Sequence, residues 1–301
     1  MMPGTDQPRT AFVFAGGGSL GAIQVGMLHS LVKHGVVADM ACGSSVGAIN
    51  AAYYAGDPSI DGIRKLEAIW RGLRRRDVFP ISLGALFGFL WRRDFLVTSE
   101  GLRKLIDAHL PYCNLEDAKM PIHIVATDII SAETVVLSKG PACDAILAST
   151  AIPAAFPPVQ MQALYLADGA ISSNTPVRVA VANGAERLII LPTGYACARQ
   201  TPPVGAVANA LHALTLLIAR QLIAELEHLE PGIDYYVLPP LCPLDCSPYD
   251  FSRTGELIER AIASTDEWID GGGLTMPRTH AQLGLHKHQP KHRSMRPRRA
   301  R

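Results

Sequence analysis

The sequence predicts an α/β domain of three layers, α/β/α, built around a largely parallel central sheet. Short apolar runs without alternation, typical of strands buried on both faces, alternate with stretches whose apolar residues recur at helical spacing. Two junctions between such a run and the next helix are rich in glycine and serine, which indicates tight strand-to-helix turns. This alternation favours βαβ units, whose ligands gather at the carboxyl ends of the strands.

The length and bulk composition fit one large globular domain or two small ones. The chain has 301 residues, of which 48% are hydrophobic, and a net charge of +1. Six cysteines are scattered without the spacing of zinc ligands, which favours isolated thiols in a reducing compartment over a disulfide framework. No metal and no cofactor are predicted. The N-terminus lacks the apolar stretch of a signal peptide. We therefore expect a cytoplasmic location, with peripheral contact to a membrane.

The first predicted unit is a strand over residues 11–15, a glycine loop over 16–21 and a helix over 22–34. In such a loop, backbone N–H groups point into one small space at the positive end of the helix. The loop is therefore suited to bind an anion or a developing oxyanion, with Gly16, Gly17 and Gly18 as the candidate oxyanion hole.

The same loop has a competing interpretation. Gly16, Gly18 and Gly21 satisfy G-x-G-x-x-G between a strand and a helix, and Asp39 follows at about the spacing of a ribose-binding acid. Against a dinucleotide site, Asp39 precedes its short strand, whereas the acid of such a site ends the strand.

The stretch G-S-S-V-G matches the G-x-S-x-G nucleophile elbow, with Ser45 between Gly43 and Gly47. A short apolar strand at 40–42 precedes it and a helix over 46–55 follows. The serine of such an elbow has a strained backbone, and the two glycines remove side chains that would collide. An acyl-transfer enzyme needs both a nucleophile and N–H donors for the oxyanion, which favours the catalytic interpretation of both turns.

A helix over 60–76 with a basic end leads into fourteen uncharged residues, 78–91, that are flanked by arginines. This stretch is too short to span a bilayer. Two interpretations stay open for the segment 77–96: an apolar lid or membrane-facing segment, or a loop and helix packed on the core.

The remaining elements follow in chain order. We predict a helix over 99–110 capped by Thr98 or Ser99, paired strands over 122–129 and 134–137, a helix over 142–150, a proline-rich loop over 151–159, a strand over 165–170, a helix opened by Asn174 and Pro176, a strand over 187–191, a helix over 204–229, a strand over 235–238 and a helix over 251–269.

A serine nucleophile needs a base, and Asp168 is the candidate. It lies in an Asp-Gly turn at the end of a predicted strand, where it would converge with the glycine loop and Ser45. The later histidines His212 and His228 lie within helical patterns, and His280 lies in the polar terminal stretch. A buried carboxylate can itself act as the base if burial raises its pKa, so we prefer a Ser45–Asp168 dyad.

Four segments in order resemble the patatin-like phospholipase family: FAGGGSLGAIQVGML, GSSVGAINA, STAIPAAFPPV and LADGAISSNTP. The resemblance implies a patatin-like fold, a Ser–Asp dyad without histidine, an oxyanion hole from Gly16, Gly17 and Gly18, and hydrolysis of lipid acyl esters without a metal. Two positions depart from the family pattern: Leu20 stands where many members have Arg or Lys, and Ala170 replaces the second glycine of Asp-Gly-Gly.

The sequence thus predicts a carboxylic ester hydrolase of the phospholipase A or lysophospholipase type, acting on phospholipid or another acyl-ester lipid. The alternative is a non-catalytic lipid- or nucleotide-binding module on the same fold. The expected organisation is a flexible N-terminus over 1–10, the hydrolase domain over 11–273 and a basic, disordered tail over 274–301. From His286 the tail holds seven Lys and Arg and no acid, which suits anionic membranes or simple solubilisation; no specific nucleic-acid partner is predicted.

Overall fold

The computed structural model describes residues 8–79, 95, 97–193, 204–244 and 246–275. Most of the expected segment 77–96 and nearly all of the expected basic tail lie outside these residues, as does most of the expected flexible N-terminus.

The described strands form one eight-stranded sheet in the order β5-β6-β3-β2-β1-β7-β8, with β4 also paired to β3. The parallel part comprises β1 (Thr10–Phe14), β2 (Met40–Ser44), β3 (Ile122–Asp128), β7 (Arg187–Leu191) and β8 (Asp234–Val237). The antiparallel part comprises β4 (Thr134–Leu137), β5 (Val159–Met161) and β6 (Leu164–Asp168). The expected largely parallel sheet is confirmed.

Two apolar cores separate the layers. In β1, Phe12 and Phe14 belong to one core, and Ala11 and Val13 belong to the other, as the alternation of side chains along a strand requires. All four are fully buried, which explains why the strand shows no polar alternation in the sequence.

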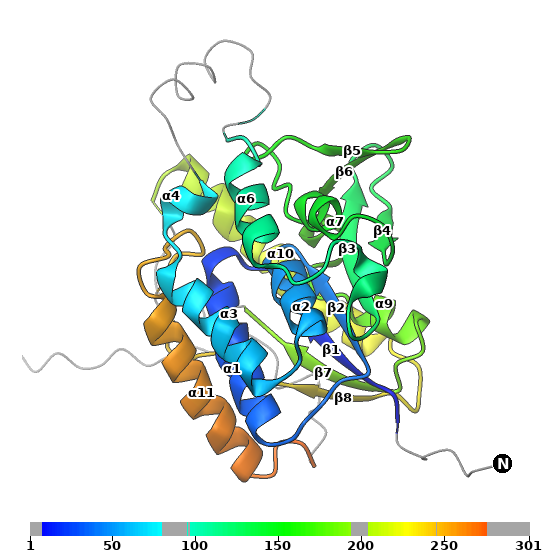
Figure 1. Cartoon of the computed structure of the whole chain (residues 1–301), viewed down its shortest axis with the longest axis vertical. Helices are drawn as coiled ribbons and strands as arrows, with labels where there is room; N and C mark the ends of the chain where they lie inside the picture. Colours follow the sequence, from blue (N-terminus) through cyan, green and yellow to red (C-terminus); the bar gives the residue numbers. More distant parts are fainter. Residues whose placement is uncertain (1–7, 80–94, 96, 194–203, 245, 276–301) are drawn as a thin grey trace, which may run out of the picture.

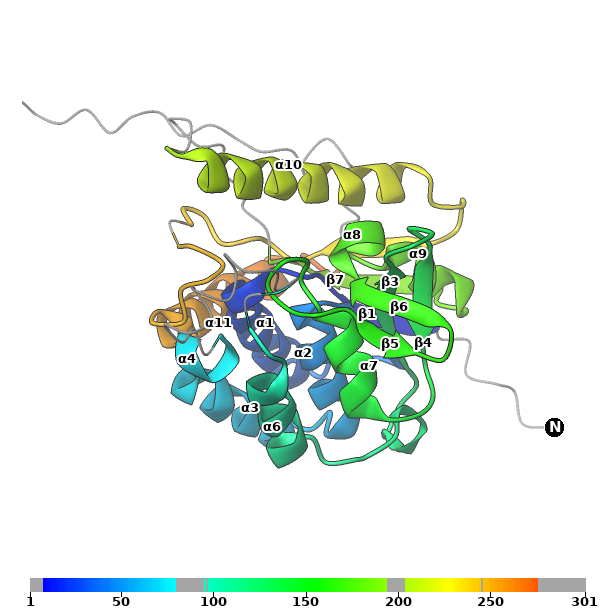
Figure 2. The ribbon, with the colours of Figure 1, turned by 90° about the horizontal axis from the view of Figure 1, so that it is seen from above.

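The helices cover both faces of the sheet (Figure 1). The larger core lies under α1 (Gly21–Lys33), α2 (Val46–Gly56), α3 (Ile60–Gly72), α6 (Glu100–His109), α7 (Ala142–Ser149) and α11 (Thr254–Asp270). The smaller core lies under α9 (Val177–Ala182) and α10 (Ala206–Glu227). Figure 2 shows α10 on the side of the sheet opposite α1, α2 and α3, so the molecule has the three expected layers.

Short helices complete the chain: η1 (Gly18–Leu20), α4 (Arg75–Val78), η2 (Leu115–Asp117) and α8 (Ala170–Ser173). The helix expected over 60–76 divides into α3 and α4, because the backbone of Leu73 and Arg74 is extended. The helix expected after Asn174 begins later, at Val177, and Pro176 is its N-cap without a side-chain hydrogen bond. Strand β5 begins at Val159, the last residue of the expected loop, and pairs with β6.

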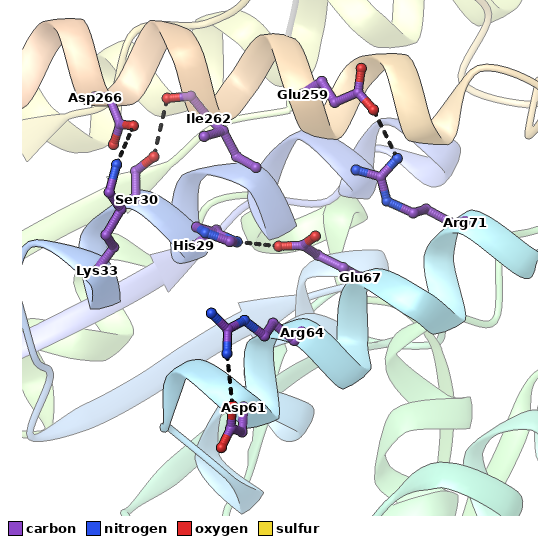
Figure 3. A network of polar contacts seen from close by, with 10 residues as sticks. All are labelled: His29, Ser30, Lys33, Asp61, Arg64, Glu67, Arg71, Glu259, Ile262 and Asp266. Carbon is purple, nitrogen blue, oxygen red and sulfur yellow. Dashed lines mark hydrogen bonds and ion pairs between the residues drawn. The ribbon is translucent and has the colours of Figure 1, made fainter.

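Polar contacts join α11 to α1 and α3 (Figure 3). Lys33 Nζ lies 2.9 Å from Asp266 Oδ2, and Ser30 Oγ donates to the Ile262 carbonyl at 3.1 Å. Arg71 lies 3.1 Å from Glu259, and His29 contacts Glu67. The C-terminal helix is therefore part of the same folded unit as the glycine loop.

Of the helices in the described ranges, none has the length and apolar content needed to cross a membrane.

Candidate active site

The register of the sheet brings Ser45 and Asp168 together. Strands β2 and β4 lie on opposite edges of β3, because both pair with its residue Val125. Strands β4 and β6 also lie on opposite edges, because both pair with Ala126. Hence β2 and β6 share one edge of β3, run in opposite directions and end next to each other. The residue after the end of β2 is Ser45, and Asp168 ends β6.

Ser45 lies in the strained turn that the elbow pattern predicts. Its φ of 55° and ψ of −128° are values that a side chain rarely allows. A Cβ atom at Gly43 would collide with the backbone of Gly47, and one at Gly47 would collide with the carbonyl oxygens of Phe14 and Ala15. Both glycines are therefore needed for β2 and α2 to approach each other at this turn.

The two side chains form a direct hydrogen bond. Ser45 Oγ donates to Asp168 Oδ2 at 2.6 Å, and the residues are only 7% and 3% exposed. The other carboxylate oxygen, Oδ1, accepts the Ala170 N–H at 2.8 Å. Burial raises the pKa of Asp168 to about 6, against the opposing effect of these two hydrogen bonds. The carboxylate is thus a stronger base than an exposed aspartate.

Ser149 supports the elbow from the helix side. Its hydroxyl accepts the N–H of Ser45 at 2.9 Å and donates to the Val125 carbonyl at 2.5 Å. Through these two hydrogen bonds Ser149 links the strained backbone of Ser45 to β3, the strand that also pairs with β6.

The glycine loop lies beside the dyad, but its donors are not equivalent. The Gly16 N–H, expected as an oxyanion donor, donates to the Asn174 carbonyl at 3.0 Å, so it is occupied. In the described part of the chain, the N–H groups of Gly17 and Gly18 have no acceptor. Gly18 has a φ of 60°. Of the three N–H groups expected to be donors, two are therefore free in the described part of the chain.

Helix α10 holds the segment that follows Asp168. Gln221 donates through Nε2 to the Ser172 carbonyl at 2.7 Å and accepts the Asn174 N–H at 3.0 Å. One turn later, Glu225 accepts the Ser173 hydroxyl at 3.0 Å. Because the Asn174 carbonyl also accepts the Gly16 N–H, α10 is connected through this segment to the glycine loop. These contacts were not predicted from the sequence, although Gln221 and Glu225 are spaced i, i+4 and therefore lie on one face of the helix, which was a usable signal.

The competing dinucleotide interpretation does not fit the structure. The Asp39 carboxylate accepts the Thr10 N–H at 2.7 Å, and its own N–H donates to the Thr10 carbonyl at 2.8 Å. Asp39 therefore lies at the start of β1, whereas the glycine loop lies at its end.

The histidines described in the structure make other contacts. His123 is hydrogen-bonded through Nδ1 to Ser138, and burial lowers its pKa. His228 contacts the Ala224 carbonyl. In the described ranges, no group of three or more His, Cys, Asp or Glu side chains is placed to hold a metal ion.

A narrow apolar pocket of about 70 Å³ opens at Ser45. It passes between α2, α3, α6 and the start of the loop before β5, and its lining includes Val46, Leu66, Trp70, Phe79, Leu102 and Phe156. The pocket can hold apolar groups of a molecule whose reacting atom lies at Ser45.

The three-layer fold, the serine elbow and the adjoining carboxylate define an α/β protein with the architecture of a serine hydrolase. The chain belongs to the patatin-like phospholipase family, whose sequence model matches residues 12–181.

Individual relatives are similar to between 57% and 85% of this chain. Lysophospholipase NTE1 of Candida albicans is 23% identical over 286 residues, which cover 85% of this chain and 19% of the relative. An uncharacterized NTE family protein of Mycobacterium tuberculosis is 32% identical over 57% of this chain and 28% of its own length. Patatin-like phospholipase domain-containing protein 7 of Rattus norvegicus is 26% identical over 61% of this chain and 13% of its own length. This chain thus spans less than a third of each relative.

Among solved structures, VipD of Legionella pneumophila is similar at 16% identity and a TM-score of 0.48, covering 88% of this chain and 67% of that one. Human GIVD cytosolic phospholipase A2 is similar at 14% identity and a TM-score of 0.44. The similarity covers 92% of this chain and 59% of the phospholipase.

Proposed function

We propose that the protein is a lipid acyl hydrolase that cleaves carboxylic esters through a Ser45–Asp168 dyad. The observation that carries the proposal is the 2.6 Å hydrogen bond between Ser45 Oγ and a buried carboxylate, at the tip of a strained elbow. The family, and the lysophospholipase among its relatives, support a lipid as the substrate.

In the first half-reaction, Ser45 Oγ attacks the carbonyl carbon of the ester, and its proton passes to Asp168 Oδ2. The carbonyl oxygen becomes an oxyanion, which the N–H groups of Gly17 and Gly18 stabilise. When the tetrahedral intermediate collapses, the ester C–O bond breaks and the leaving alcohol takes the proton from Asp168. The acyl group remains on Ser45.

In the second half-reaction, water attacks the acyl-enzyme and gives its proton to Asp168. Collapse of the second intermediate returns this proton to Ser45 Oγ and releases the fatty acid. A pKa of about 6 suits both steps, because the group is ionised at neutral pH and is still basic enough to accept a proton.

The apolar pocket that opens at Ser45 supports an acyl chain as the part of the substrate bound there. The fatty acyl group would be held next to the nucleophile, while the alcohol part of the ester would extend away from it.

The proposal is tested with a fluorophosphonate probe and a p-nitrophenyl ester. We expect Ser45→Ala to remove both probe labelling and ester hydrolysis, because the nucleophilic oxygen is absent. The matched control is Ser44→Ala: the Ser44 hydroxyl is buried without a partner among the described residues, so its loss should leave labelling intact. Full activity of Ser45→Ala would refute the proposal. Lipid binding by a wild-type protein that the probe does not label would instead support a non-catalytic module.

A further inference from the structure

A second cavity lies beside the apolar pocket, between α4 and the loop that precedes α11. Figures 1 and 2 show these two segments of the backbone side by side. It measures about 410 Å³ and is lined by Leu73, Arg74, Arg75, Ser247 and the residues 249–252; we call it the arginine cavity. We propose that the arginine cavity binds the phosphate group of the lipid substrate while the acyl chain occupies the apolar pocket. This inference rests on the proposed function, whose substrate class it narrows.

The arginine cavity and the apolar pocket are adjacent. Leu73 and Phe251 line both. Phe79, from the apolar pocket, contacts the rings of Tyr249 and Phe251 at centroid distances of 6.2 and 6.3 Å. One elongated amphipathic molecule can therefore reach both spaces.

The wall of the arginine cavity also contacts the glycine loop. The N–H of Ser19 donates to the Pro248 carbonyl at 2.7 Å, and its hydroxyl donates to the Ser247 carbonyl at 3.2 Å. A Cβ atom at Gly18 would collide with the same Pro248 oxygen. The cavity therefore lies next to the loop proposed to hold the oxyanion.

Tyr249 extends this connection to the dyad. The pKa of Tyr249 is raised mainly by burial and, in addition, by the charge of Asp168, which agrees with the contacts of residues 247 and 248 with the glycine loop. Gly18 of that loop and Ser45 both line the apolar pocket, so a substrate group in the arginine cavity would lie near the ester bond that Ser45 attacks.

The charges around the cavity favour an anion. Arg74 and Arg75 are exposed and, among the described residues, neither side chain has an ion-pair partner. The other arginines of this cluster, in contrast, have carboxylate partners: Arg71 pairs with Glu259 at 3.1 Å, and Arg76 lies 4.0 Å from Asp77.

Two carboxylates near the arginine cavity, those of Asp77 and Asp250, could compete for the guanidinium groups, but both already accept hydrogen bonds from other donors. Asp77 accepts the backbone N–H of Arg74 at 2.8 Å. Asp250 accepts the N–H and the hydroxyl of Ser252 at 2.9 and 2.6 Å, and it lies near the charge of Arg253. The two guanidinium groups therefore remain for a ligand.

Guanidinium groups bind phosphate oxygens through paired N–H donors, which is the strongest contact that this set of side chains offers. The hydroxyl groups of Ser247 and Tyr249 add neutral donors along the wall. A phosphate held here would orient a phospholipid with its acyl ester toward the dyad.

The experiment compares two substrates that differ only in the phosphate: lauroyl lysophosphatidic acid and monolauroylglycerol, both kept monomeric. We expect the double variant Arg74→Gln/Arg75→Gln to lower the ratio of their kcat/KM values about tenfold. The matched control is Arg76→Gln, an exposed arginine on the same helix that does not line the cavity; it should keep the ratio within about twofold. An unchanged ratio in the double variant, or an equal fall in Arg76→Gln, would overturn the proposal, because the second result indicates general attraction to surface charge.

A binding measurement separates this inference from the proposed function, because it needs no turnover. Glycerol 3-phosphate and inorganic phosphate are titrated calorimetrically into the Ser45→Ala protein, with and without the two arginine substitutions. Binding of glycerol 3-phosphate that the substitutions weaken at least tenfold supports the cavity even if the protein hydrolyses no ester. Binding of inorganic phosphate alone would assign the cavity to the free anion and overturn the assignment to a lipid headgroup.

Discussion

At the scale of single residues, Asp168 combines two opposing requirements. In the proposed dyad the carboxylate must be ionised to take a proton from Ser45, yet its burial disfavours the charged form. The two hydrogen bonds from Ser45 and Ala170 offset only part of this cost. The residue therefore gains basicity at the expense of the stability of the folded chain.

The first prediction concerns the pH dependence of hydrolysis. Because only the ionised carboxylate accepts the serine proton, kcat/KM should rise with pH through about 6 and reach a plateau above it. Asp168→Asn should lose at least about a thousandfold in kcat at every pH, since the amide cannot act as a base. The measurement is a pH–rate profile with a neutral p-nitrophenyl ester; a profile without a step between pH 5 and 7 would contradict the assignment.

The second prediction concerns stability. The pKa of Asp168 is raised from 3.8 to about 6 on folding, so the folded state holds the proton more tightly than the unfolded state. The resulting destabilisation grows as the pH rises through this interval and reaches about 3 kcal/mol above it. Asp168→Asn should therefore be more stable than the parent chain at pH 7.5, with a smaller difference at pH 4.5. Urea unfolding at both pH values measures the difference in unfolding free energy between the variant and the parent chain. The same difference at both pH values would argue against a buried charge.

At the scale of elements, close contact between backbones decides the shape of the elbow. Gly47 of α2 faces the carbonyl oxygens at the end of β1, so even one methyl group has no room. We expect Gly47→Ala to abolish fluorophosphonate labelling and to lower the thermal midpoint markedly. Gly72→Ala is the control: Gly72 ends α3 with open space around it, and alanine there should be neutral or stabilising by up to about 1 kcal/mol. A labelled, stable Gly47→Ala protein would refute this account of the turn.

The contact of α10 with the segment after Asp168 leads to a further prediction. Gln221 fixes the backbone of Ser172 and Asn174, and Asn174 in turn accepts the Gly16 N–H. Gln221→Leu keeps the size of the side chain but removes both hydrogen bonds. We expect kcat to fall roughly ten- to a hundredfold with little change in KM, because the dyad and the loop lose their alignment. Arg220→Ala, at an exposed neighbouring position, should keep kcat; a proportional rise in KM in Gln221→Leu would indicate a binding role instead.

At the scale of the whole molecule, the chain beyond the family match completes the core. The match ends at residue 181, yet Leu257, Ile258 and Ala261 of α11 are buried in the larger core. We expect Ile258→Ala to cost roughly 2–5 kcal/mol of unfolding free energy, because it leaves a cavity under α11.

The matched variant is Lys33→Ala, which breaks the exposed ion pair to Asp266 between the same two helices and should cost less than about 1 kcal/mol (Figure 3). Urea unfolding of both variants tests this order. A larger loss from Lys33→Ala than from Ile258→Ala would show that polar contacts, rather than apolar burial, hold α11 in place.

The alternation of apolar runs with helical patterns was sufficient to predict the three-layer fold and most strands, because strands buried on both faces consist almost entirely of apolar residues. Strand β5 was not predictable in this way. It is three residues long, and its pattern resembles a loop until β6 pairs with it.

The sequence alone was enough to propose Ser45 and Asp168 as the site residues, because the elbow and the Asp-Gly turn have local backbone requirements that can be read from their glycines. Only the tertiary structure decided which of the glycine N–H groups are free, because the acceptor for Gly16 comes from Asn174, far along the chain. The tertiary structure likewise decided that Gln221 contacts the segment after Asp168 and that Arg74 and Arg75 line a cavity. Partners of this kind are fixed by strand register and helix packing, which the periodicity of the sequence does not encode.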